Sequence, residues 1–352
     1  MNKISKYFAA ILLTGALLMP FAQGFAGNKD RSGQAGASEL LINPWARSSG
    51  WGGANVAHVK GLEGLFGNVA GTAHTKGTEL IFSNTQWLQG SEISINTFGL
   101  TQKMGESGVI GLGIMSMNFG DIPITTEDLP EGGIGNFNPS YMNINLSYAK
   151  AFSSSIYGGI NIKVVSEVIS DVSAQGIAID AGIQYLTGPR ENVRFGITLR
   201  NVGPTMKFSG DGLSIRTLLP GQESSFTVEQ RSADFELPTQ LALGASYDFY
   251  IAEMHRLTLA GNFISNSFNQ DQFIGGIEYE LKSYLMLRAG YAYEDGITKK
   301  AERTTAFTGP SAGFTVAVPL DKEKGSSIAI DYSYRATDPF SGTHSIGARI
   351  NL

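Results

Sequence analysis

Residues 240–250 read QLALGASYDFY, and apolar side chains alternate with small or polar ones along the whole stretch. One face carries Leu241, Leu243, Ala245, Tyr247 and Phe249, and the other carries Gln240, Ala242, Gly244, Ser246 and Asp248. Successive side chains of a β-strand point to opposite faces, so alternation with a period of two predicts a strand. The pattern is typical of a strand that has lipid on one side and a polar interior on the other.

Similar alternating runs, separated by turn signals, follow one another from residue 78 to residue 352. We expect fourteen strands, at 78–87, 90–101, 108–118, 139–151, 154–166, 175–187, 191–202, 235–250, 254–264, 270–280, 283–294, 307–318, 326–335 and 343–352. An even number of strands is what a bacterial outer-membrane barrel requires.

The lengths of the connections alternate along the chain in a regular phase. The turns after even-numbered strands are short, at 102–107, 152–153, 188–190, 251–253, 282 and 319–325, whereas 119–138 and 203–234 lead the longer loops. Hydropathy alone would also suit a soluble secreted β-sandwich, but a sandwich has no reason to alternate loop length. Short periplasmic turns and long outer loops are typical of outer-membrane barrels. The sequence thus predicts an all-β fold, a 14-stranded antiparallel transmembrane β-barrel with periplasmic termini in the bacterial outer membrane.

Ahead of the strands lies a glycine-rich stretch, residues 44–73, which does not alternate. Leu62, Leu65, Phe66 and Val69 fall at i, i+3, i+4 and i+7, which predicts a short helical stripe. We expect this stretch to fill the barrel lumen as a hatch, with Arg47 and Lys60 paired to lumen carboxylates. The hatch residues we single out are Trp45, Arg47, Gly50, Trp51, Gly52, Gly53, Asn68 and Gly71.

The N-terminal residues 1–26 resemble a secretory signal peptide. Lys3 and Lys6 precede a short apolar run, and small-residue cleavage patterns follow it. The alternative, a membrane-anchoring helix, needs about 20 apolar residues, more than this run supplies. We therefore expect a signal peptide at 1–26, a lead-in and hatch at 27–77, and the barrel at 78–352.

Several motifs resemble the FadL-like superfamily, and within it the PorV/PorQ family of type IX secretion outer-membrane proteins. Residues 46–54 read ARSSGWGGA, similar to the family's opening, and residues 67–71 read GNVAG where the family has Asn-Pro-Ala-Gly. Later matches are LRNVGP at 199–204, LPT at 237–239 and GTHSIG at 342–347. Val69 replaces the proline of the second motif and removes a rigid turn. The resemblance implies a fourteen-strand barrel with an N-terminal luminal hatch.

Composition and residue spacing exclude several kinds of chemistry. The chain has no cysteine and a net charge of −5, so it has neither thiolate sites nor a basic surface for nucleic acid. The four histidines are scattered, and the sequence has no HExxH pair of metal ligands. It also has no GxSxG motif of a hydrolase and no glycine-rich dinucleotide-binding motif between a strand and a helix. We expect no enzyme activity, no metal and no cofactor.

Two further groups of residues are candidates for a functional role. On the predicted polar face lie Asp180, Arg194, Arg200, Glu278, Glu280, Arg288, Asp331, Arg335 and Arg349. They line a conduction or binding path, or they pair with each other across the lumen and hold the hatch; the second interpretation fits the polar interior of barrels. In the first long loop, Asp121, Ile122, Ile124, Glu127, Asp128 and Leu129 form a candidate partner surface, whose alternative is a merely solvated loop.

Three functions remain open, and we expect the first. The resemblance implies a secretion-system component that docks translocon subunits, exported cargo or surface attachment partners through its outer loops. The alternative is a FadL-like channel for hydrophobic small molecules, which would need an apolar pocket and a lateral opening; the charged and polar lumen faces argue against it. The third function is a purely structural barrel of the envelope. We expect outer-membrane lipid as a partner in either case.

Overall fold

Fourteen strands form one closed antiparallel barrel in the computed structural model, which describes residues 29–218, 221, 224–321 and 325–352. The expected signal peptide lies outside the described residues. The barrel strands are β1 (Thr78–Gln86), β2 (Ser94–Met104), β3 (Gly108–Asn118), β6 (Ser140–Ala151), β7 (Ile156–Ile169), β8 (Val172–Thr187), β9 (Val193–Val202), β12 (Gln240–Ala252), β13 (His255–Asn266), β14 (Gln272–Leu281), β15 (Leu285–Tyr293), β16 (Phe307–Asp321), β17 (Ser326–Thr337) and β18 (Thr343–Asn351). All fourteen correspond to predicted strands, so the predicted fold class is confirmed.

Each strand pairs with its neighbour in the chain, and the last strand pairs with the first. β18 lies antiparallel to β1 in a register that runs from Glu79 opposite Asn351 to Gln86 opposite His344. This pairing satisfies both sheet edges, which is the condition for a β-structure to stand in a bilayer.

The boundaries differ from the predicted ones where turn chemistry intervenes. β12 begins at Gln240 rather than at residue 235, because Pro238 has no backbone N–H to donate to a neighbouring strand. β2 begins at Ser94 rather than at residue 90, since Gly90 adopts a φ of 105° in a turn closed by a Trp87 N–H to Ile93 carbonyl hydrogen bond of 3.0 Å.

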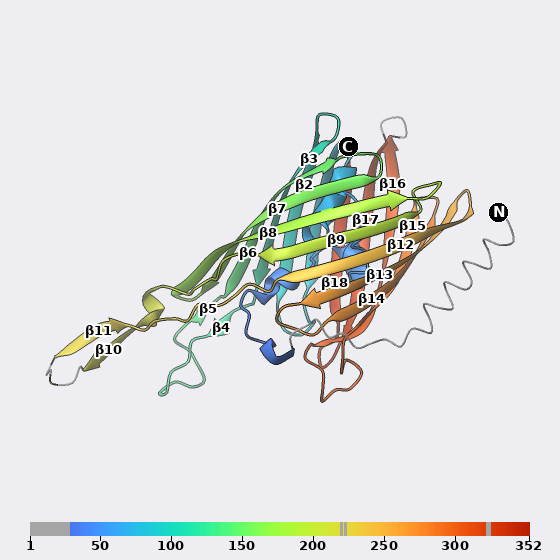
Figure 1. The fold of residues 1–352 in the computed structure, drawn as a ribbon. Coiled ribbons are helices and arrows are strands. Elements are labelled where there is room, and N and C mark those ends of the chain that lie inside the picture. Colours follow the sequence, from blue (N-terminus) through green and yellow to red (C-terminus); the bar gives the residue numbers. More distant parts are fainter. Residues whose placement is uncertain (1–28, 219–220, 222–223, 322–324) are drawn as a thin grey trace.

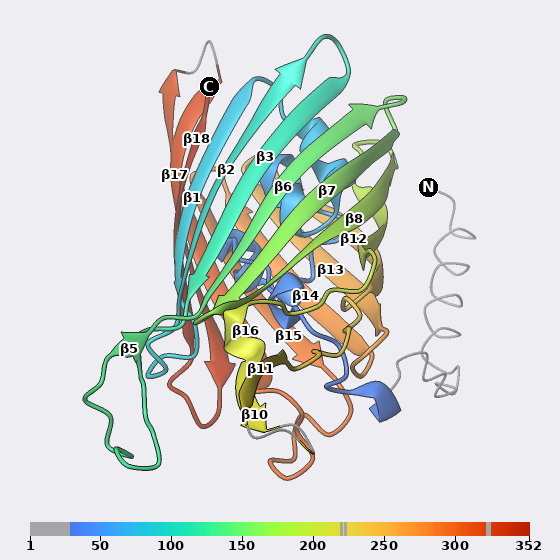
Figure 2. The same cartoon turned by 90° about the vertical axis from the view of Figure 1, so that its left-hand side faces the viewer.

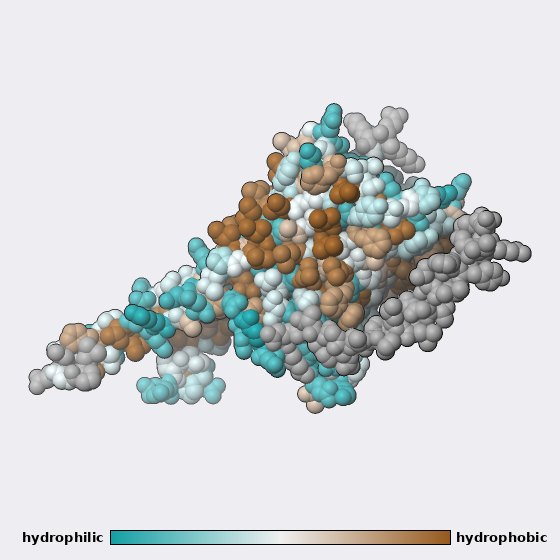
Figure 3. All heavy atoms as spheres, viewed as in Figure 1, coloured by the Kyte–Doolittle hydropathy of each residue, from teal (hydrophilic) through white to brown (hydrophobic). Residues whose placement is uncertain are grey.

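The two sides of the wall differ in the predicted way. Leu241, Leu243, Tyr247 and Phe249 are exposed on the outside, whereas Asp248 on the inner face is 1% exposed. Figure 3 shows the resulting apolar side chains across the barrel wall. A closed barrel with an apolar exterior and a polar interior is a membrane-spanning β-barrel.

The long loops gather at one end of the barrel, together with the two-residue turn 170–171 between β7 and β8, and the other end carries only short turns. We call the first the outer end and the second the periplasmic end, following the rule for outer-membrane barrels. Two small hairpins that sequence analysis did not predict lie in the long outer loops. They are β4 (Ile122–Pro123) with β5 (Asn136–Phe137), and β10 (Ser214–Leu218) with β11 (Ser225–Glu229). The β10–β11 hairpin projects far beyond the barrel (Figure 1).

Among the described residues, no helix is long and apolar enough to cross a membrane. The helices are short: η1 (Lys29–Arg31), η2 (Ser38–Leu41), α2 (Ala46–Gly50), η3 (Gly61–Phe66), η4 (Val69–His74) and η5 (Asp211–Leu213).

Candidate functional site

The segment between residues 37 and 75 lies inside the barrel, and we call it the hatch; Figure 2 shows its helices within the ring of strands. Trp45 and Trp51, which the sequence singled out, are each 1% exposed. Leu62, Leu65, Phe66 and Val69 are all buried, but they do not share one helix. η3 ends at Phe66, and η4 begins at Val69. The predicted single stripe was therefore wrong in form, because Gly67 adopts a non-helical conformation and Asn68 caps a new turn.

The hatch backbone touches the wall where strand glycines leave space. A Cβ added to Gly290 of β15 would collide with the Trp51 carbonyl group, and the Cα atom of Gly313 on β16 faces Gly50. Within the hatch, Gly52 and Gly53 have φ values of 67° and 89°, a turn that glycine makes without strain. The glycines that sequence analysis placed in the hatch thus serve close packing.

Asn68 fastens the hatch to the wall. Its side chain is fully buried, and its Nδ2 donates to the carbonyl oxygen atoms of Val56, 3.1 Å away, and Ile183 on β8, 3.0 Å away. Its Oδ1 accepts from the Ala70 N–H at 3.1 Å, which caps η4. One side chain therefore joins two hatch segments and a strand. Gly71 lies nearby in η4, against the Val59 carbonyl group.

A first ion-pair network joins the hatch to β13, β14 and β15. Glu278 lies at its centre, with Arg288 Nε at 2.6 Å, Arg256 Nη2 at 3.1 Å and Arg47 Nη2 of the hatch at 3.3 Å. Glu280 completes the network at the periplasmic rim by pairing with Arg256. Three guanidinium groups around one fully buried carboxylate compensate its desolvation.

A second network joins the hatch to the first and last strands. Arg349 of β18 places Nη2 2.8 Å from both Glu63 of the hatch and Asp331 of β17. Glu79 of β1 accepts a hydrogen bond from the Leu62 N–H at 2.8 Å. The hydroxyl group of Thr315 connects the two networks through hydrogen bonds with Arg288 and Asp331.

A third group of charges lies on the other side of the lumen. Lys163 Nζ pairs with Asp180 at 2.7 Å, and Arg194 Nη2 pairs with Asp248 at 2.8 Å. His58 of the hatch lies against Arg194. Burial, followed by the charge of Arg194, holds the pKa of His58 well below its usual value, so the ring is neutral.

Lys60 behaves differently from the expectation that it pairs with a lumen carboxylate. Among the residues that the structure describes, no carboxylate oxygen lies within 4.0 Å of its ammonium group. Burial and the charges of Arg194 and Arg256 lower the pKa of Lys60 to about 8. The expected pairing was therefore right for Arg47 and wrong for Lys60.

Two predicted lumen arginines contact no carboxylate among the described residues. Arg200 donates to the Phe66 carbonyl oxygen at 2.8 Å and to Gln240. Arg335 stacks its guanidinium group over the Phe307 ring, with Cζ 3.8 Å from the ring centroid. The nine predicted lumen residues thus all lie on the inner wall, but they divide into paired charges and these two arginines.

Four cavities follow one another through the lumen. The outer vestibule, about 520 Å³, lies between residues 38–42, Trp87, Phe119 and Phe307, and the outer hatch cavity, about 100 Å³, lies beneath it. Leu41, Gln240, Gln272 and Arg335 line both and form the throat between them.

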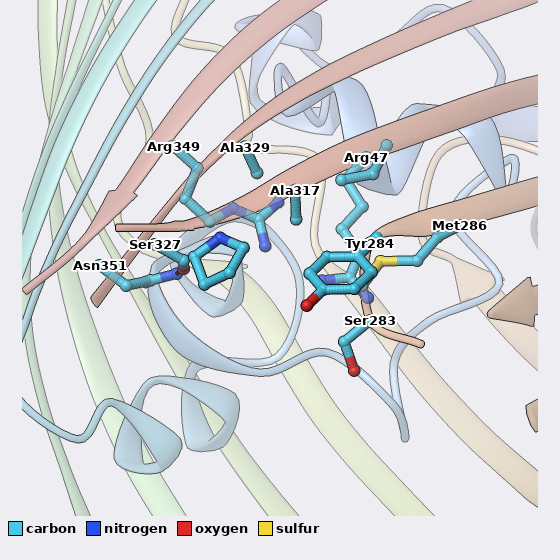
Figure 4. A pocket seen from close by; sticks show the side chains of 11 residues that line it. Arg47, Ser283, Tyr284, Met286, Ala317, Ser327, Ala329, Arg349 and Asn351 are labelled. Carbon is cyan, nitrogen blue, oxygen red and sulfur yellow. Dashed lines mark hydrogen bonds between the residues drawn. The ribbon is translucent and has the colours of Figure 1, made fainter. Parts of the chain in front are cut away.

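The next two cavities continue the series toward the periplasm. The inner hatch cavity, about 60 Å³, shares Asn55 with the outer hatch cavity and contains Lys60 and Arg256 in its lining. The periplasmic vestibule, about 290 Å³, shares Arg47 with it. Figure 4 shows Arg47 and Arg349 pointing into this last cavity from opposite sides. The series runs from one end of the barrel to the other, and its two smallest cavities lie at the hatch.

The predicted partner loop lies away from the lumen. Asp121, Ile122, Ile124, Glu127, Asp128 and Leu129 are all exposed in the loop between β3 and β6. Their role in binding a partner stays a prediction.

Sequence reasoning missed several residues that join the hatch to the wall. Glu63, Glu79, Lys163 and Arg256 take part in the ion pairs but were not predicted, and Asp248 was placed on the polar face of its strand but not among the candidate residues. Extending the period-two pattern back to the start of β1 would have placed Glu79 on the inner face. Within the described parts of the chain, no group of three or more histidine or acidic side chains could hold a metal ion.

Comparisons with known proteins agree on the fold. No protein-family model matches the chain, and no curated protein sequence matches it. Among solved structures, it is similar to the CymD monoaromatic hydrocarbon channel, with a TM-score of 0.53, 14% identity, and coverage of 88% of this chain and 97% of the other. The Ralstonia pickettii toluene transporter TbuX gives a TM-score of 0.52 at 14% identity, with the same coverage. A Pseudomonas aeruginosa FadL homologue gives 0.50 at 11% identity, covering 87% and 96%.

These likenesses show that the chain has the fold of FadL-like barrels. The closed 14-strand barrel and its apolar exterior place the protein in the outer membrane as a multi-pass β-barrel. The finer resemblance to the PorV/PorQ family is not shown by these neighbours.

Proposed function

We propose that this barrel is a channel for small, largely apolar molecules, which enter at the outer vestibule and pass the hatch to the periplasm. The observation that carries the proposal is the series of four cavities, each of which shares lining residues with the next. The outer vestibule has the volume of a small-molecule site and apolar walls from Trp87, Met117, Phe119 and Phe307. The solved structures that resemble the whole barrel include proteins described as monoaromatic hydrocarbon channels and toluene transporters.

Passage requires the hatch to move. The inner hatch cavity is about 60 Å³, smaller than either vestibule, and it shares Arg47 with the periplasmic vestibule and Asn55 with the outer hatch cavity. Arg47 is held by Glu278, so opening this point exchanges a buried ion pair for contacts with solvent. The hatch is thus the gate of the proposed channel.

A disulfide can test both the channel and its gate. A Cβ built at Gly347 lies 3.5 Å from the Ala46 Cβ, which is within disulfide range, and the chain has no native cysteine. We expect liposomes that contain the wild-type barrel to take up labelled toluene faster than empty ones. The oxidised Ala46→Cys/Gly347→Cys variant should slow uptake, and a reductant should restore it.

Single-cysteine variants serve as controls for the cysteine substitutions themselves. Uptake no faster than in empty liposomes would overturn the proposed channel. Normal uptake by the oxidised variant would keep the channel but move its path away from α2.

The second candidate is the docking role in type IX secretion, which the projecting hairpins favour. β10 and β11 extend beyond the barrel and expose Ile215, Leu218 and Phe226 (Figure 1). Exposed apolar side chains on a long outer loop suit a partner surface. Replacing residues 214–229 by a short Gly-Ser linker should abolish capture of translocon subunits or exported cargo from native membranes. If the intact tagged barrel captures neither, the docking role is excluded.

A further inference from the structure

The arginine at the throat of the outer vestibule is one of two lumen arginines without a carboxylate partner among the described residues, and the other, Arg200, donates instead to the Phe66 carbonyl oxygen and to Gln240. Arg47, Arg194, Arg256, Arg288 and Arg349 each contact a carboxylate. Arg335 contacts no carboxylate in the described chain, although it lies on the inner wall of β17. A partly buried guanidinium group without an anionic partner bears a desolvation cost that an anion would offset.

The geometry around Arg335 leaves its donors available. Its guanidinium plane packs on Phe307, whose ring packs edge-on against Trp87 with centroids 5.3 Å apart. The N–H donors of a guanidinium group lie in its plane, so stacking on a ring leaves the donor edge free for a planar bidentate anion. Arg335 lines both the outer vestibule and the cavity beneath it, so this edge lies at the throat.

The vestibule above the throat suits a compact ring rather than a long chain. Trp87, Phe119 and Phe307 provide aromatic walls, and Ile93 and Met117 add apolar surface, around a volume of about 520 Å³. Aromatic rings pack on one another in offset or edge-to-face arrangements.

Two carboxylates, Glu39 and Glu294, also line the vestibule. Glu294 accepts hydrogen bonds from Gln272 Nε2 at 2.9 Å and from the Thr304 hydroxyl group at 3.3 Å. Burial raises the pKa of Glu39 above its usual range, which favours its neutral form. Glu39 therefore opposes an anion at the throat less than an exposed carboxylate would, and the Glu294 oxygen atoms are directed to Gln272 and Thr304.

We infer that the outer vestibule is a binding site for aromatic carboxylates, whose ring packs among Trp87, Phe119 and Phe307 and whose carboxylate pairs with Arg335. The inference rests on the proposed channel only for the fate of the ligand, since binding at the vestibule needs no passage. It differs from the neutral hydrocarbons named for the neighbouring structures.

A neutral isostere separates charge recognition from ring recognition. Calorimetry on the full barrel in detergent, with 2-naphthoate and 2-naphthamide as probes, should show saturable binding of both and at least about tenfold tighter binding of the carboxylate, since hydrogen bonds to charged groups are the stronger ones. Trp87 fluorescence should change on binding, and Trp87→Phe should remove this change, because Trp45 and Trp51 lie buried in the hatch. Equal affinities for the two probes, or no saturable binding, would overturn the inference.

Variants of Arg335 then test whether its positive charge recognises the carboxylate of naphthoate. Arg335→Gln should weaken naphthoate binding about tenfold or more and leave naphthamide unchanged, while Arg335→Lys should retain part of the preference. Arg216→Gln, which removes an exposed positive charge on β10, is the matched control and should change neither affinity. An unaltered naphthoate affinity in Arg335→Gln, or far tighter binding of laurate than of naphthoate, would also overturn the inference.

Uptake into liposomes distinguishes this inference from the proposed function. Charge-dependent binding without uptake of naphthoate or toluene leaves the site in place and removes the channel. Uptake of toluene without any preference for naphthoate leaves the channel and removes the site.

Discussion

Arg349 in the last strand and Glu63 in the hatch lie 2.8 Å apart, although 286 residues separate them in the chain. The same guanidinium group reaches Asp331 at 2.8 Å, so one cation holds two buried carboxylates from different parts of the fold. This relationship fixes the hatch to the barrel at the point where the barrel closes.

Removing this cation should loosen the hatch. Arg349→Met leaves Glu63, Asp331 and Glu79 buried near one another without their shared partner, and removing one side of a buried ion pair costs about 3–5 kcal/mol. We expect a loss of that order in the free energy of unfolding, measured by urea titration of tryptophan fluorescence.

Lys299→Gln is the control for this change. Its ion pair with Glu302 has side-chain exposures of 67% and 53%, so its loss should cost less than about 1 kcal/mol. Equal losses in the two variants would contradict the structural role of Arg349.

Two glycines of adjacent strands should respond differently to alanine. Gly290→Ala places a Cβ against the Trp51 carbonyl group, whereas a Cβ at Gly275 on β14 meets nothing within 4 Å. We expect Gly290→Ala to displace the hatch and cost roughly 1–3 kcal/mol through overpacking. Gly275→Ala should change the free energy of unfolding by less than about 0.5 kcal/mol, as surface substitutions do.

The measurement is the same urea titration, together with protease cleavage of the hatch. Cleavage should increase in Gly290→Ala alone. If Gly290→Ala were as stable as the wild type and its hatch as resistant to protease, the hatch position would not depend on the close contact between Gly290 and the Trp51 carbonyl group.

The strands and their faces were predictable because a single local rule governs them. Each side chain from Gln240 to Asp248 faces lumen or lipid according to its parity, and the rule needs no knowledge of distant residues. The pairing of Arg349 with Glu63 follows instead from barrel closure and hatch placement, which no local pattern contains. The outer vestibule was missed for the same reason, since Trp87 and Phe307 meet only after strands far apart in sequence come together.

A histidine in the hatch should make stability depend on pH. Burial, followed by the charge of Lys60, lowers the pKa of His74 from its usual 6.5 to about 4. Between pH 6.5 and 4 the unfolded chain therefore binds more protons at this residue than the folded one, so the free energy of unfolding falls as pH falls. The contribution amounts to at most about 3 kcal/mol and is smaller where water reaches the ring.

His74→Gln removes this contribution. Its loss of stability from pH 7 to pH 4 should be smaller than that of the wild type in urea titrations at each pH. His344→Gln, whose ring lies near the outer end of the barrel and bonds to Tyr332, is the comparison. Identical pH profiles for His74→Gln and the wild type would show that the His74 ring is already open to solvent.

The side-chain amide of Asn68 should contribute more to the free energy of unfolding than the amide of an exposed asparagine. Asn68→Ala leaves the carbonyl groups of Val56 and Ile183 without this donor and removes the η4 cap, at a cost of roughly 2–3 kcal/mol. Asn96→Ala, which removes the partner of Asn84 in an exposed pair, should cost well under 1 kcal/mol. Comparable unfolding midpoints for the two variants would mean that other contacts fix the hatch.

The seam between β1 and β18 has a consequence for how the hatch and the barrel wall hold each other. Glu79 on the first strand holds the Leu62 N–H, and Arg349 on the last strand holds Glu63, so adjacent residues of the hatch bridge the two strands that meet last. A seam without the hatch would lose both contacts and leave Arg349 with the carboxylates of Asp331 and Glu79 alone. Residues near the start of the described chain therefore contribute to the seam that the last strand closes, and we expect loosening of the hatch and opening of the seam to be coupled.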